Sequence, residues 1–130
     1  MIVLAPISVG ELIDKITILE IKLDIINDNS KRDNIHNELN QLLDILNKLD
    51  LPDITVLRKK LKQVNNELWE IEDNKRDCEH NKQFDDFFIE QARQVYLKND
   101  YRASIKRDIN IFCKSDIIEE KSHKSVVSTH

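Results

Sequence analysis

The chain has a single glycine, Gly10, among its 130 residues, and this scarcity constrains the fold more than any motif does. Phosphate-binding loops and dinucleotide-binding turns need several glycines, because only a residue without Cβ lets the backbone approach a phosphate closely. Tight β-hairpins depend on glycine in the same way. The sequence therefore argues against a Rossmann unit, a P-loop or a multistranded sheet. It predicts an all-α fold.

Length and charge favour one small cytoplasmic domain. A chain of 130 residues has too little core for two domains. Its net charge of −4 is spread evenly, which argues against a broad basic surface for duplex nucleic acid. Residues 1–5 are apolar but too few for a signal-peptide core or a membrane span. We expect no membrane contact, and we expect Cys78 and Cys113 to be reduced thiols.

The first helix is predicted to begin at a capping box and to be apolar on two faces. In Ser8-Val9-Gly10-Glu11, the Ser8 hydroxyl and the Glu11 carboxylate can each bind an unpaired backbone N–H. Two apolar stripes follow on nearly opposite sides, one of Leu12, Ile16, Leu19, Leu23 and Ile26, the other of Ile18, Ile21 and Ile25. Such a helix is either central or shared with another subunit. Residues 2–4, just before it, are the only strand-like run.

Two further helices are predicted from apolar stripes with 4-3-4-3 spacing, over residues 30–49 and from a cap at Asp53 to about Cys78. The short turn Leu51-Pro52-Asp53 joins them. Two such stripes with so short a connection are typical of an antiparallel helical hairpin.

A last helix is expected from about Phe84 to Phe112, followed by a disordered polar tail over residues 119–130. The sequence thus predicts a single helical domain over residues 1–118. Its architecture is an up-down bundle of about four helices built around the antiparallel hairpin.

The last helix carries a conflict between its two halves. In the first half, the core face consists of Phe88, Ala92 and Val95. In the second half, the same face continues with the polar residues Asn99, Lys106 and Asn110, and Arg102 lies beside it. The apolar stripe of the second half lies on a different side of the helix and consists of Tyr101, Ile105, Ile109 and Phe112. Burying the two cations without partners would cost several kcal/mol each. Either the helix breaks at Asn99-Asp100, with Asp100 capping a new helix, or a polar pocket forms in which Arg102 and Lys106 bind an anion.

The first helix offers a matching row of Glu11, Lys15 and Lys22. One explanation is an ordinary exposed ion pair between Glu11 and Lys15. The other is that the lysines line the same pocket, which would then need an acidic wall or an anionic ligand. The predicted ligand-binding residues are Glu11, Lys15, Lys22, Asn99, Arg102, Lys106 and Asn110.

The third helix has a polar row opposite its leucines, with Asp77 at its end, which is either a solvated face or the acidic wall of that pocket. Because tryptophan is a common interface anchor, we predict an interface or second site formed by Asn66, Trp69, Glu70, Asp73 and Arg76. The spacing of Glu67, Glu70 and Asp73 is also similar to that by which helical nucleotide pyrophosphohydrolases hold Mg²⁺. Since acidic residues are common in the chain and no histidine has metal-ligand spacing, we predict no metal and no cofactor.

Several segments together resemble an uncharacterised family of small bacterial helical proteins, a domain of unknown function. The resemblance spans about residues 1–121. It implies one compact helical domain and no particular activity, and it implies that the polar positions belong to the family's pattern. The segments are residues 5–8 (APIS), 10–22 (GELIDKITILEIK), 64–73 (VNNELWEIED), 76–79 (RDCE) and 95–103 (VYLKNDYRA).

Three functions remain open from the sequence. The first is a non-catalytic binding or assembly module, a homodimer through the second face of the first helix or the Trp69 side, with a site for an anionic small ligand. The second is a small helical enzyme acting on a carboxylate or phosphate, either by electrostatic catalysis like a chorismate mutase or as a Mg²⁺-dependent nucleotide pyrophosphohydrolase. The third is a protein that sequesters an anion without converting it. Whether the chain is an enzyme is left open.

Overall fold

The structure is a computed structural model that describes residues 1–124 and 126. It contains four helices, α1 (Val9–Ile25), α2 (Asn29–Asn47), α3 (Thr55–His80) and α4 (Asp86–Phe112). No strand occurs in this part of the chain, and residues 2–4 are exposed and unpaired with any strand. The predicted all-α bundle of four helices is confirmed. Among the described residues, none of the helices combines the length and the apolar character that crossing a bilayer would need.

Side chains bind backbone N–H groups at the starts of all four helices, and at α3 the predicted Asp53 accepts from the N–H of Thr55 at 3.0 Å. The Ser8 hydroxyl accepts from the Glu11 N–H at 3.0 Å, as predicted, and Asp28 and Asp85 accept from Ser30 and Phe88 at 3.3 and 3.2 Å. These bonds satisfy N–H groups that have no partner within the helix. The other half of the predicted capping box does not form, because the Glu11 carboxylate pairs with a lysine of α4.

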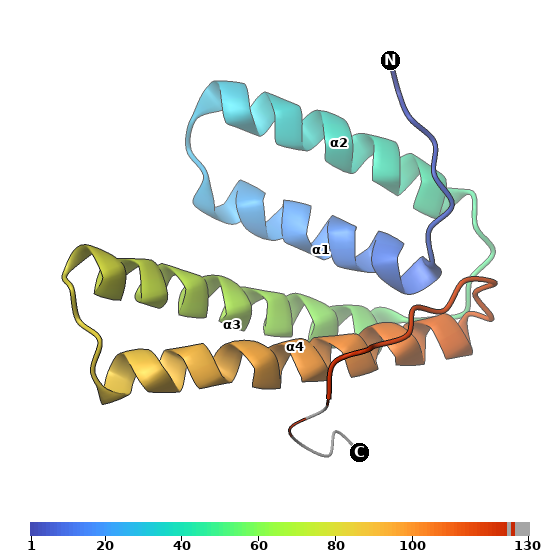
Figure 1. The fold of residues 1–130 in the computed structure, drawn as a ribbon. Helices are drawn as coiled ribbons and strands as arrows, with labels where there is room; N and C mark the ends of the chain where they lie inside the picture. The colour runs from blue at the N-terminus through green and yellow to red at the C-terminus, as the bar shows by residue number, and fades with distance from the viewer. Residues whose placement is uncertain (125, 127–130) are drawn as a thin grey trace.

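The helices form two antiparallel hairpins, α1–α2 and α3–α4, that lie one on the other (Figure 1). Helix α1 contacts the three other helices, which confirms the central position, one of the two alternatives predicted for it. Helix α2 packs against α1 and makes no close backbone approach to α3. The prediction that the second and third helices pair as a hairpin is therefore wrong, although the apolar stripe predicted on each of them is present.

The two apolar faces of α1 explain this arrangement. One face, with Leu12 and Ile16, packs on Ile35 and Leu39 of α2. The other face, with Ile13, packs on a cluster of α3 and α4 residues that comprises Leu61, Val64, Ile105 and Ile109. The regular spacing of apolar residues predicts a stripe on α2 and another on α3, but it does not say which helix each stripe packs against. In the structure both stripes face α1. On the second predicted face, Ile21 is buried, whereas Ile18 is half-buried and Ile25 is exposed, so the chain covers that face only in part.

Helix α4 is continuous through Asn99 and Asp100, so the predicted break is wrong. Asp100 lies within the helix, is 6% exposed and accepts a hydrogen bond from Lys121. No break is needed because the cations of the second half of α4 meet carboxylates of α1. Ile105 and Ile109 are buried as the shifted stripe predicts, whereas Tyr101 and Phe112 remain exposed.

Gly10 lies where α1 and α4 approach most tightly along this face. A Cβ at this position would lie 2.6 Å from the carbonyl oxygen of Lys106 and 2.9 Å from Oδ1 of Asn110. The backbone N–H of Gly10 donates to that same Asn110 oxygen at 2.6 Å. The single glycine of the chain is therefore required by a close helix contact, since any side chain would meet backbone of α4.

We expect Gly10→Ala to lower the free energy of unfolding by about 1–3 kcal/mol, because the cost of overpacking exceeds the helical preference for alanine. Urea unfolding followed by circular dichroism measures the change in the free energy of unfolding. The control is Asn40→Ala on the exposed side of α2, which should change stability by less than about 0.5 kcal/mol. Equal stability of Gly10→Ala and the wild type would contradict the close approach.

Candidate functional site

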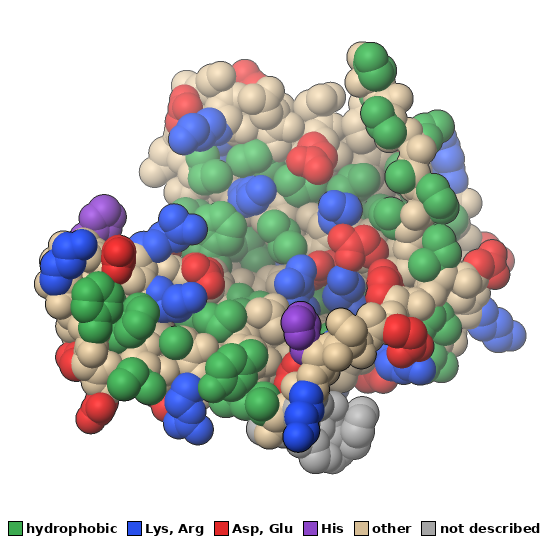
Figure 2. Space-filling model, in the orientation of Figure 1, with side chains coloured by type: hydrophobic (Ala, Val, Ile, Leu, Met, Phe, Trp, Pro, Cys, Tyr) green, Lys and Arg blue, Asp and Glu red, His purple; other side chains and the backbone are tan. Residues whose placement is uncertain are grey.

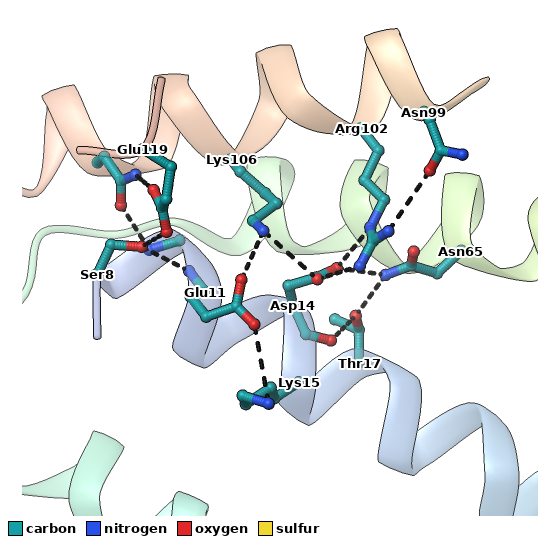
Figure 3. A network of polar contacts seen from close by, with 12 residues as sticks. Ser8, Glu11, Asp14, Lys15, Thr17, Asn65, Asn99, Arg102, Lys106 and Glu119 are labelled. Carbon is teal, nitrogen blue, oxygen red and sulfur yellow. Dashed lines mark hydrogen bonds and ion pairs between the residues drawn. The ribbon is translucent and has the colours of Figure 1, made fainter. Parts of the chain in front are cut away.

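Asp14, in the middle of α1, is a carboxylate buried against α3 and α4 (Figure 3). It is 1% exposed. Arg102 of α4 donates from Nε to Oδ1 at 3.1 Å and from a terminal nitrogen to Oδ2. Asn65 of α3 donates from Nδ2 to Oδ1 at 2.8 Å and to the hydroxyl of Thr17 at 3.0 Å. Two-point binding by arginine together with an amide satisfies the buried charge and fixes the guanidinium in one orientation.

Lys106 forms a second connection between α4 and α1. Its Nζ lies 2.6 Å from Oε2 of Glu11 and 3.7 Å from Oδ2 of Asp14. Lys15, at the exposed edge, lies 3.8 Å from the other oxygen of Glu11. Figure 2 shows Lys, Arg, Asp and Glu side chains gathered over the middle of the molecule, where α1 passes α4. The carboxylates that pair with Arg102 and Lys106 therefore come from α1 and not from the acidic row of α3.

The segment after α4 turns back along that helix (Figure 1). We call residues 115–121 the C-terminal strap. The carboxylate of Glu119 accepts from the Ser8 hydroxyl and, at 2.9 Å, from Nδ2 of Asn110. Glu120 pairs with Arg107 at 3.1 Å, and Lys121 pairs with Asp100. Three residues of the tail predicted for residues 119–130 thus contribute to this site, while residues 125 and 127–130 lie outside the described part.

The setting of Glu119 changes its acidity. Partial burial tends to raise the pKa of this carboxyl, but the hydrogen bonds from Ser8 and Asn110 and the charge of Lys106 outweigh it. The pKa of Glu119 is lowered from its ordinary value of 4.5. The strap is therefore held by an ionised carboxylate at neutral pH.

Two cavities adjoin at Arg102 and Asn99, which line both. The tryptophan cavity, about 450 Å³, lies between α1, α3 and α4. Its apolar walls are Ile18, Ile21, Leu68, Trp69 and Val95, and its other polar groups are Asn65, Glu72, Asp73 and Arg76. The strap cavity, about 270 Å³, lies between α4 and the strap and is lined also by Ala103, Lys106, Arg107, Glu119, Glu120 and Lys121.

The structure brings together most of the residues predicted for the two sites. The first group comprises Glu11, Asn99, Arg102, Lys106 and Asn110, with Lys15 at its edge, and the second comprises Trp69, Asp73 and Arg76. Lys22, Asn66 and Glu70 line neither cavity. Asp73 and Arg76 of α3 thus share the tryptophan cavity with Arg102, whereas the polar row of α1 meets α4 through Glu11 and Lys106.

Sequence reasoning missed Ser8 as a ligand of the strap, Glu119, Asp14, Thr17 and Asn65. Two of these gave a signal. Asp14 continues the second apolar face of α1, four residues before Ile18, and Asn65 lies four residues after Leu61 on the leucine face of α3. A polar residue within a core stripe indicates a buried partner.

The carboxylates with Mg²⁺-like spacing do not gather into a metal site. Glu67 pairs with Lys98 of α4 at 2.5 Å, and Glu70 is exposed. Within residues 1–124 and 126, no three His, Cys, Asp or Glu side chains are grouped so that they could hold a metal ion. The thiols of Cys78 and Cys113 are free, and burial raises the pKa of both.

The chain matches the model of one protein family. The matching model is described as a family of unknown function (DUF6165), and the match covers residues 3–130. No curated protein and no solved structure matches the chain.

We expect Arg102→Ala to lower the free energy of unfolding by about 3 kcal/mol, because Asp14 would stay buried without its main counter-charge. Chemical denaturation measures the loss. The matched control is Lys98→Ala, which breaks a half-exposed pair on the same helix and should cost less than about 1 kcal/mol. Adding Asp14→Asn to Arg102→Ala should restore part of the loss. If it restores nothing, lost packing and not the unpaired charge causes the effect.

Acid should release the strap. Because the folded pKa of Glu119 lies below its ordinary value of 4.5, its stabilising contribution is complete above that pH and disappears as the pH falls through the folded pKa. Amide NMR signals of residues 115–121, followed from pH 6 to pH 3, should move toward unstructured values. Glu119→Gln should dock more weakly and lose this step. An identical acid transition in both proteins would show that other carboxylates control the strap.

Proposed function

The chain belongs to the family of unknown function DUF6165, and we propose that it is a small binding module that holds an organic anion in the tryptophan cavity. One observation carries the proposal. Arg102 is fixed by the buried Asp14 through one edge of its guanidinium, and the same side chain lines a cavity with apolar walls. An arginine held in this way offers its remaining N–H groups to a ligand.

The remaining hydrogen-bonding capacity of Arg102 supports an anionic ligand. Its Nε and one terminal nitrogen bind Asp14, whereas NH1 has only a long contact of 3.5 Å to Oδ1 of Asn99. The side chain is 28% exposed. Since its orientation is already fixed, a carboxylate or phosphate would bind it without the entropic cost of ordering a long side chain.

The walls of the cavity favour a ligand with an apolar body. Ile18, Leu68 and Val95 from three helices line it together with Trp69, whose ring suits a flat body. A volume of about 450 Å³ falls within the range of small-molecule sites. The expected ligand therefore has an anionic group that binds Arg102 and Asn99 and an apolar or aromatic body that packs against Trp69.

Turnover of such a ligand is the alternative. Glu11 and Asp14 both pair with cations of α4, so neither offers a carboxylate set aside for proton transfer. Glu72 and Asp73 do line the cavity, and product formation from a bound anion would favour a small enzyme. We further propose that the module is cytoplasmic and homo-oligomeric. The two predicted interfaces are the Trp69 side and the second face of α1, on which Ile25 is exposed.

The fluorescence of Trp69, the only tryptophan, provides the test. Benzoate or phenyl phosphate should change it saturably, whereas uncharged benzamide should bind at least about tenfold more weakly, since a charge-assisted hydrogen bond contributes about 1.5–3 kcal/mol. Arg102→Lys keeps a charge opposite Asp14 but loses the planar donor edge, so its Kd should rise about tenfold. Lys22→Ala, outside both cavities, is the control. Equal binding of benzamide and benzoate would refute the anion site.

A further inference from the structure

The strap cavity has more cations on its walls than carboxylates. Arg102, Lys106 and Arg107 of α4 line it together with Lys121 of the strap and with the carboxylates of Glu119 and Glu120, and Lys121 is also paired with Asp100 of α4. Arg102 and Lys106 are also held from behind by Asp14 and Glu11 of α1. A cavity lined by several cations suits a group with more charge and more acceptor oxygens than a carboxylate has.

The two strap carboxylates are held very differently. Glu119 binds two side chains that are each 1% exposed, Ser8 and Asn110, so it anchors the strap to the start of α1. Among the described residues, Glu120 forms an ion pair with Arg107 alone, at 3.1 Å, and the two side chains are 78% and 50% exposed. Exposed pairs of this kind contribute little to stability. Glu120 can therefore leave Arg107 while Glu119 keeps the strap in place.

We propose that the strap cavity is a phosphate site, in which Glu120 serves as an internal counter-ion that phosphate displaces from Arg107. The phosphate oxygens take over the guanidinium of Arg107 and lie within reach of Lys106 and Lys121. A phosphate carries about −1.5 to −2 charges at neutral pH and three strong acceptors, against one charge for Glu120. The two cavities share Arg102 and Asn99, but the proposed phosphate ligands Arg107, Lys106 and Lys121 line only the strap cavity, so the phosphate site does not require a ligand in the tryptophan cavity.

Titration of the full-length protein with inorganic phosphate at constant ionic strength tests the site, with amide NMR signals of residues 100–121 as the readout. Saturable shifts should centre on Arg107 and Glu120. Glu120→Gln removes the competing carboxylate and should lower Kd about threefold to tenfold. Arg107→Gln should raise Kd at least about fivefold in the wild-type background and cancel the gain in the Glu120→Gln background.

Glu90 and Arg93 provide the matched controls, because they form an exposed pair on the same helix, at 3.0 Å, and line neither cavity. Glu90→Gln changes net charge as Glu120→Gln does and should leave Kd unchanged. The proposal is overturned if Glu90→Gln tightens binding equally, or if neither the wild type nor Glu120→Gln saturates by 20 mM phosphate. Phenyl phosphate is run in parallel. Tighter binding of this ester than of inorganic phosphate identifies a phosphomonoester, and the reverse identifies the free ion.

These outcomes are independent of the tryptophan cavity. Benzoate can change the Trp69 fluorescence while phosphate leaves residues 100–121 unmoved, and then only the strap site is refuted. Phosphate can shift Arg107 and Glu120 while no carboxylate affects Trp69, and then only the tryptophan-cavity site is refuted.

Discussion

A buried carboxylate determines how three of the four helices meet. Asp14 is nearly inaccessible to water, and a charge in that position is tolerated only if donors surround it. Those donors come from α3 and α4, so the side chains of Asn65 and Arg102 fix the rotation of both helices about α1. The ion pair thus selects one arrangement and, in doing so, orients the arginine that both cavities share.

The local structure could be predicted from the sequence because its causes are local. Ser8 and the apolar periodicity located α1 within a residue or two, and the scarcity of glycine indicated helices throughout. Helix pairing could not be predicted in this way. The stripes of α2 and α3 have almost the same spacing, and only the two-faced α1 decides that each packs against it. The two apolar faces of α1 can be recognised in the sequence, and they determine which helices pack together.

The candidate site was predictable only where its signal lies within a single helix. Arg102 and Lys106 stood out because they interrupt a core face, which is a feature of one helix. Their partners were harder to find, since Asp14 is separated from Arg102 by 88 positions in the chain. Glu119 lies in a polar segment that has no periodicity of its own. Its position depends on Asn110 and Ser8, so nothing within the segment could indicate it.

The central position of α1 also affects the protein while it is being synthesised. Its partner α2 follows directly in sequence, so one apolar face can be covered as soon as residues 35–39 have emerged. The other face, around Ile13, needs Ile105 and Ile109, and the ties to Ser8 need Glu119. In a nascent chain, α3 can therefore cover only part of this face, and Asp14 lacks its arginine partner until α4 has been made. Such long-range closure is typical of chains that fold late and all at once, even when every element is a helix.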